Sequence, residues 1–175
     1  EFVFTGGGTA ALASAAAAGT AGNDAIQLTG FASANTNKID VGATFQGGAG
    51  KAEGANSNKG ALGGDALQVA PGTNSPADET TITLKGFDLT GGTGGKGGTA
   101  SGSEGAGGNG GYGINAADFE TINLVSTGAT ATAANNLIGG TAGAAGGGSA
   151  ATGTAGAGIL VNTNGVINVT GANDL

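Results

Sequence analysis

The sequence contains no cysteine, histidine, tryptophan, methionine or arginine. Without cysteine the chain can form neither a disulfide nor a thiolate metal site. Without histidine or cysteine, the familiar pairs of a nucleophile and a general base are absent as well. Pairs of carboxylates could still catalyse glycoside hydrolysis, and the close acids are Asp118 with Glu120 and Asp78 with Glu79. Solvated turn acids explain both pairs, so we expect that the protein is not an enzyme.

Positive charge is also scarce. All five cationic residues are lysines, and the formal net charge at pH 7 is −7. A protein that binds nucleic acid needs patches of arginine or lysine, and here the lysines are scattered. No apolar run approaches the roughly 18 residues of a membrane span. We therefore expect neither a nucleic-acid partner nor a transmembrane segment.

What the chain has in abundance is glycine, which accounts for 41 of its 175 residues. The usual share is about 7%. Alanine, threonine, asparagine and serine supply most of the remainder, and charged residues make up only 10%. Such a composition cannot fill a wide core, but it can fill a thin one in which small side chains stack close to the backbone.

One short unit recurs along the chain and predicts its fold class. Residues 22–31 place an acid after a small turn, then Ile26 and Leu28 two positions apart, then a closing glycine. Related units lie at residues 64–69 and 79–87, and looser ones at 38–42, 120–124 and 166–171. Apolar residues at i and i+2 have the period of a strand. The chain is therefore predicted to be all-β.

The spacing of these units favours a coil. Their first apolar residues are separated by 13, 28, 15, 40 and 45 positions, each near a multiple of 13 to 15. This is typical of stacked repeats, and we predict a parallel β-solenoid or β-roll, with an antiparallel β-sandwich as the alternative. The residues predicted to point inward are Ile26, Leu28, Ile39, Val41, Leu67, Val69, Ile82, Leu84, Ile122, Leu124, Val161, Ile167 and Val169.

Residues 1–175 are predicted to form a single repetitive β domain, which is either one period of a longer tandem polypeptide or a separate subunit that stacks on its copies. It is interrupted by loop-like glycine-rich stretches at 46–64, 90–113 and 139–157. In the second stretch, glycine pairs recur about every three residues. That spacing fits either a flexible loop or packed polyproline-II-like strands with glycine where the chains touch. The pair Asn164-Gly165 similarly indicates either a hairpin or a corner of a solenoid.

The unit Gly22-Asn23-Asp24-Ala25-Ile26-Gln27-Leu28 is similar to the glycine–aspartate nonapeptide of RTX proteins, whose parallel β-roll binds calcium at its turns. Residues 119–124, in their Thr/Ala/Gly/Asn-rich setting, also resemble bacterial S-layer proteins and repetitive surface adhesins. These resemblances imply a secreted, calcium-stabilised protein. The candidate calcium ligands are Asp24, Asp65, Asp174, Asp40 and Asp88. The alternative is that these acids only cap turns.

The expected function is that of an extracellular structural protein of a bacterial or archaeal surface. The two ends of the chain suggest that copies assemble head to tail, because residues 173–175 begin a repeat unit that residues 1–6 would complete. The residues predicted to make this junction are Glu1, Phe2, Val3, Phe4, Asn173, Asp174 and Leu175. The alternative is a non-enzymatic adhesin module that binds glycan or ice.

Overall fold

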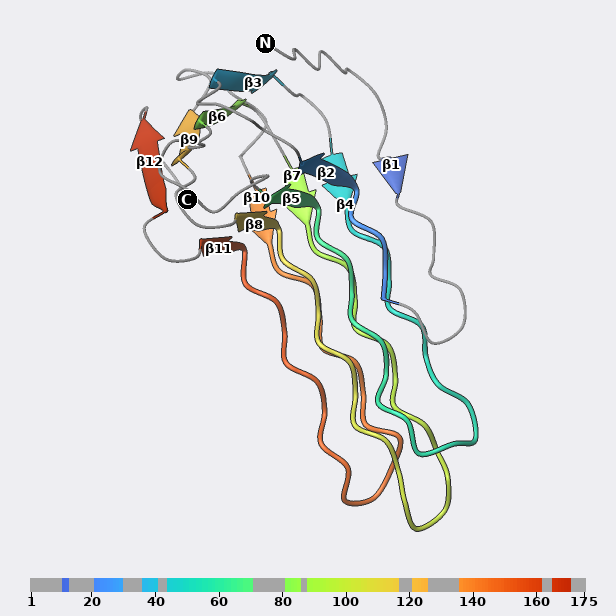
Figure 1. Cartoon of the computed structure of the whole chain (residues 1–175). Helices are drawn as coiled ribbons and strands as arrows, with labels where there is room; N and C mark the ends of the chain where they lie inside the picture. The colour runs from blue at the N-terminus through green and yellow to red at the C-terminus, as the bar shows by residue number, and fades with distance from the viewer. Residues whose placement is uncertain are drawn as a thin grey trace.

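The computed structural model describes residues 11–12, 21–29, 36–40, 44–70, 81–85, 88–116, 121–125, 136–161 and 165–170. In these residues the regular elements are all strands, and they form three parallel sheets (Figure 1). No helix in the described part of the chain is long and apolar enough to span a membrane.

Each sheet takes every third strand of the chain. The first sheet has the order β1 (Ala11–Leu12), β4 (Thr44–Gln46), β7 (Asp88–Thr90), β10 (Asn136–Ile138). The second has the order β2 (Ile26–Thr29), β5 (Leu67–Ala70), β8 (Ile114–Ala116), β11 (Ile159–Val161). The third has the order β3 (Thr36–Asp40), β6 (Thr81–Lys85), β9 (Thr121–Val125), β12 (Val166–Thr170).

The chain therefore winds through four stacked three-sided coils, each of which adds one strand to every sheet. The register is constant within a sheet: Leu67 pairs with Ile26 on one side and Ile114 on the other. The predicted all-β parallel solenoid is confirmed. β11 and β12 belong to different sheets, so they do not pair with each other as the two strands of a hairpin.

The core is thin and lies between the sheets. Its buried apolar residues are Ala66, Leu67, Val69, Leu89, Ile114, Ala116 and Ile122. Leu67, Val69 and Ile122 were among the residues predicted to point inward, and Ile26 and Val161 pack partly buried against them. Ile167 was also predicted to be inward, but 41% of it is exposed because it lies on the last coil.

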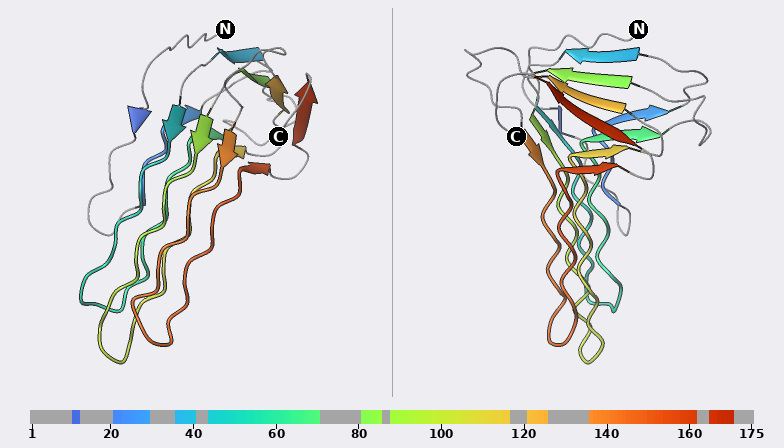
Figure 2. Two further views of the ribbon diagram at one scale, coloured as in Figure 1. Left: turned by 180° about the vertical axis from the view of Figure 1, so that it is seen from behind. Right: turned by 90° about the vertical axis from the view of Figure 1, so that its left-hand side faces the viewer.

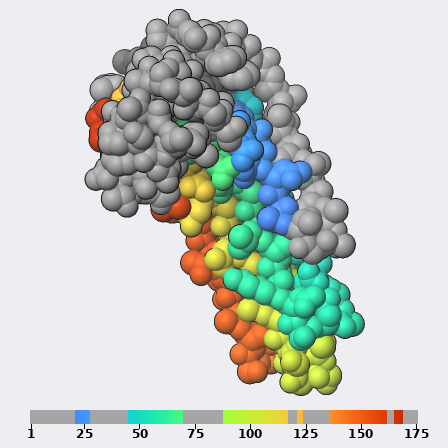
Figure 3. All heavy atoms as spheres, viewed as in Figure 1, coloured from blue at the N-terminus to red at the C-terminus, as the bar shows by residue number. Residues whose placement is uncertain are grey.

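The three glycine-rich stretches are long hairpins that project side by side from the sheets (Figure 2). Each hairpin leaves the first sheet through an outgoing segment and enters the second sheet through a returning segment. These segments are hydrogen-bonded to one another along most of their length. Figure 3 shows them as one bundle, with neighbouring segments in contact.

Hydrogen bonds in the bundle repeat every three residues, as the second outgoing segment illustrates. Gly94 N–H donates to Thr141 on the next outgoing segment at 2.9 Å, and Gly95 N–H donates across to Ala61 on a returning segment at 2.8 Å. Lys96 is exposed, while its carbonyl accepts from Glu53 N–H at 2.9 Å. A threefold repeat with bonds between segments is the geometry of packed polyproline-II helices.

Candidate functional site

Two aspartates mark the corner where returning segments enter the second sheet. Asp24 and Asp65 each lie two residues before a strand, on neighbouring coils. Asp24 Oδ1 accepts the Asp65 N–H at 2.7 Å, and Asp65 Oδ1 accepts the Tyr112 N–H at 2.7 Å. Asp65 Oδ2 also accepts Asn115 Nδ2 at 2.8 Å. Each carboxylate therefore caps a backbone amide of the next coil.

The two carboxylates differ in environment. Asp65 is only 7% exposed, and its N–H donors compensate for its burial. Partial burial raises the pKa of Asp24 above the ordinary aspartate value of 3.8. The hydrogen bond from the Asp65 N–H lowers this pKa, and the nearby charge of Asp65 raises it further. The folded environment of Asp24 thus favours its protonated form.

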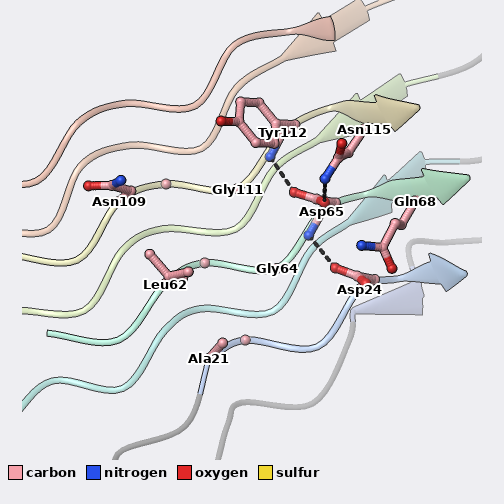
Figure 4. Close-up of a pocket in the computed structure, with 13 residues that line it drawn as sticks. Ala21, Asp24, Leu62, Gly64, Asp65, Gln68, Asn109, Gly111, Tyr112 and Asn115 are labelled. Atoms are coloured by element: carbon pink, nitrogen blue, oxygen red, sulfur yellow. Dashed lines mark hydrogen bonds between the residues drawn. The ribbon is translucent and has the colours of Figure 1, made fainter. Parts of the chain in front are cut away.

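A hollow of about 350 Å³ opens beside these aspartates. Figure 4 shows its side chains, which come from three returning segments and from the strands that follow them. Beside the carboxylates it contains apolar surface from Leu62 and Tyr112 and the amides of Gln68, Asn109 and Asn115. The aspartates after small turns were visible in the sequence, but the amides and the tyrosine come from separate coils and were missed.

The five predicted calcium ligands are not gathered at one place. Asp24 and Asp65 adjoin one another, whereas Asp88 begins β7 in a different sheet. Asp40 ends β3, where its register partner is Lys85, and Asp174 lies outside the described residues. Within the described residues, no three acidic side chains are grouped closely enough to hold a metal ion.

The outer face of the outgoing segments carries small side chains at every third position. Ala49, Thr93 and Thr141 lie on successive segments, and Thr141 Oγ1 lies 3.2 Å from Thr93 Oγ1. One turn further along, Lys96 is flanked by Ala52 and Ala144 on the neighbouring segments, and all of these residues are exposed. This face is therefore regular and formed mainly by small side chains, from which Lys96 protrudes.

The last coil exposes three large apolar side chains, and one of them has a buried counterpart deeper in the stack. Ile167 on β12 has the register position of Ile122 on β9, and their exposed fractions are 41% and 0%. On the same coil Val166 is 45% and Ile138 is 51% exposed. At Ile167 the end of the solenoid thus leaves an apolar core position open to solvent.

The bundle differs from the solenoid at its last segment, where a side chain takes the place of glycine. Gly63 and Gly110 of the returning segments face the following outgoing segment, and a methyl on either would lie 2.0 or 2.1 Å from a backbone oxygen. The same position in the last returning segment is Ala155, which is exposed. A further segment cannot pack there at the spacing found inside the bundle.

The residues predicted to join copies at the chain ends, 1–4 and 173–175, lie outside the described residues, as do Asp78, Glu79, Asp118 and Glu120.

No family model matches the sequence, and no curated protein matches it. Among solved structures, the chain matches the springtail antifreeze protein of Granisotoma rainieri, described as a bundle of nine polyproline type II helices. The identity is 23%, and the match covers 83% of this chain and 97% of that one. The TM-score is 0.21, which is too low for an argument about fold or function.

Proposed function

We propose that the protein is an extracellular structural protein of a bacterial or archaeal surface, whose copies assemble head to tail into a filament or lattice. The observation that supports this most is the open end of the last coil. Ile167 is exposed where its counterpart Ile122 is fully buried. A second copy would remove this apolar surface from water, which stabilises association by about 25 cal/mol for each Å² buried.

Strand order favours the first coil of another copy as the occupant. In all three sheets the first and last coils form opposite edges, and all neighbouring strands that pair are parallel. An edge strand presents unpaired backbone groups to a partner strand. Stacking one copy on the next would continue all three sheets in the same direction, and a head-to-tail contact that does not close generates a filament.

We further propose that calcium ions stabilise the protein, in line with its resemblance to RTX and S-layer proteins. Asp24 is the ligand that the corner favours, because both oxygens of Asp65 already accept hydrogen bonds. Calcium prefers six to eight oxygen ligands, so backbone carbonyls would have to complete the site.

Assembly is tested with a charge placed at the open end. Purified wild-type protein, Ile167→Lys and Thr154→Lys are compared by sedimentation velocity and negative-stain electron microscopy over a range of concentrations. Thr154 is exposed on the bundle, so its lysine variant adds the same charge away from the contact. We expect filaments from wild type and Thr154→Lys, and monomers from Ile167→Lys.

A wild-type protein that stays monomeric at every concentration would refute the assembly, and so would an Ile167→Lys variant that polymerises normally. Removing residues 1–5 tests the terminal junction separately. Filaments that persist without these residues would reject the junction but leave the contact between coils in place.

The second candidate function is that of an adhesin module, and the regular face of the outgoing segments favours it. Thr93, Thr141 and Ala49 present small side chains on adjacent segments, as an ice-binding surface would. A thermal-hysteresis assay tests this candidate. Activity that is lost in Thr93→Lys would support it, and an absence of hysteresis in the wild type would remove it.

A further inference from the structure

The hollow at the aspartate corner combines fixed polar groups with apolar surface. It lies between the bundle and the second sheet and has a volume of about 350 Å³. Small-molecule sites are typically concave, with a few well-placed polar groups beside apolar side chains. We propose that this hollow binds a neutral saccharide, which is an activity independent of head-to-tail assembly.

Hydrogen bonds to neighbouring residues orient the amides around the hollow. Asn115 Nδ2 donates to Asp65, so its Oδ1 remains as an acceptor. Gln68 Oε1 accepts from Gln27 Nε2, so the Gln68 amide nitrogen remains as a donor. Asn109 Oδ1 accepts the Thr154 N–H at 3.1 Å, which likewise leaves its amide nitrogen. The hollow thus offers both donors and acceptors, which suits hydroxyl groups because each hydroxyl both donates and accepts.

Apolar surface lies on two sides of these polar groups. Tyr112 is half-buried, and Figure 4 shows its N–H facing Asp65 while its ring points away from that carboxylate. Leu62 lies on the adjacent returning segment and is 48% exposed. An aromatic ring that carries a hydroxyl supplies both a flat apolar face and a hydrogen-bonding group. A sugar ring, with its C–H faces and peripheral hydroxyls, matches this combination.

The charges select against other ligand classes. The lining contains two carboxylates and no lysine, so an anionic ligand such as a phosphate or a uronate would be repelled. Both Asp65 oxygens are engaged, which leaves Asp24 as the carboxylate with an oxygen outside these bonds. A neutral polyol needs no such charge and can use Asp24 as a further acceptor.

The test uses a panel of neutral sugars: glucose, galactose, mannose, N-acetylglucosamine and their disaccharides. Saturation-transfer NMR detects binding, and ¹H–¹⁵N spectra of the labelled protein locate it. We expect millimolar binding of at least one sugar, with shifts at the amides of Gln68, Tyr112 and Asn115. Tyr112→Ala should weaken it about tenfold or more, corresponding to about 1.4 kcal/mol, while Tyr112→Phe should weaken it less.

The control variant is Thr93→Ala, on the opposite layer of the bundle, which should bind like wild type. Dispersed ¹H–¹⁵N spectra establish that each variant is folded. If Tyr112→Ala does not fold, Gln68→Ala is the second variant that tests the site. The proposal is overturned if no sugar shifts these amides, if Tyr112→Ala and Gln68→Ala bind normally, or if binding disappears when calcium is chelated. A filament-forming protein that binds no sugar would refute this site without affecting the proposed assembly.

Discussion

Glycine is required at most positions in the bundle because its backbones touch, and two positions illustrate the rule and its exception. A methyl at Gly95 would lie 2.0 Å from the Lys51 carbonyl oxygen, far inside any contact distance. At Gly54 a methyl would meet nothing within 4 Å. Both glycines belong to outgoing segments of the bundle. A neighbouring segment is present at both, since the Gly54 carbonyl accepts the Thr99 N–H at 2.9 Å. The requirement is therefore steric and depends on whether another backbone lies where the methyl would point.

We predict that Gly95→Ala lowers the free energy of unfolding by about 1–3 kcal/mol or more, the typical cost of forcing atoms into a packed interior. Gly54→Ala should change it by no more than about 0.5 kcal/mol, as for an ordinary surface substitution. Urea unfolding of the two variants measures the difference. Equal effects would mean that the segments are not packed as described.

The raised pKa of Asp24 predicts a pH dependence with a definite sign. Because the folded-state pKa lies above the unfolded value near 3.8, the folded state binds the proton more tightly. This contribution to stability is complete below the unfolded pKa and is lost as the pH rises through the folded pKa. Asp24→Asn keeps an acceptor for the Asp65 N–H but cannot ionise. Its stability should therefore not fall in this way as the pH rises.

The measurement is the melting temperature of wild type and Asp24→Asn from about pH 3 to pH 7. The two curves should separate as the pH rises, with the wild type falling relative to the variant. Parallel curves would refute the assigned environment of Asp24.

In the same experiment at pH 7, calcium should raise the melting temperature of wild type more than that of Asp24→Asn, and chelator should reverse the gain.

At the scale of the elements, the strands were predictable and their partners were not. Alternating apolar residues located β2, β5, β6, β9 and β12, because a strand with one buried face imposes period two on its own sequence. Ile114 is fully buried, yet β8 was missed, since Ile114-Asn115-Ala116 has a single large apolar residue. Its burial comes from pairing with β5 and β11 on other coils, which a local pattern cannot reveal.

The glycine-rich hairpins were only half predictable. The spacing of about three residues between glycine pairs in residues 90–113 indicated a packed polyproline-II arrangement as one of two interpretations. The choice between them depends on neighbours about 45 positions away, such as Thr141 for Gly94. The polar site was less visible still, because Gln68, Tyr112 and Asn115 become neighbours only when the coils stack.

At the scale of the whole molecule, the solenoid and the bundle end in opposite ways. The last coil of the solenoid leaves Ile138, Val166 and Ile167 exposed. The last returning segment of the bundle instead carries Thr152 and Ala155 where the preceding one has Gly107 and Gly110. A copy stacked on this end can therefore extend the sheets but cannot continue the bundle at its internal spacing. In an assembled filament the bundles would project as separate units.

This difference predicts that substitutions at two equivalent positions, 110 and 155, change the free energy of unfolding by very different amounts. Gly110→Ala should be strongly destabilising, since its methyl would lie 2.1 Å from the Gly140 carbonyl oxygen. Ala155→Leu should leave the unfolding free energy within about 0.5 kcal/mol of wild type, because Ala155 is exposed. Ala155→Leu should also polymerise like wild type, because the contact between copies is made by the coils alone. Urea unfolding and electron microscopy of this variant check both expectations. If Ala155→Leu folds normally but no longer forms filaments, the bundle itself takes part in the contact, and the account of how the two halves end is wrong.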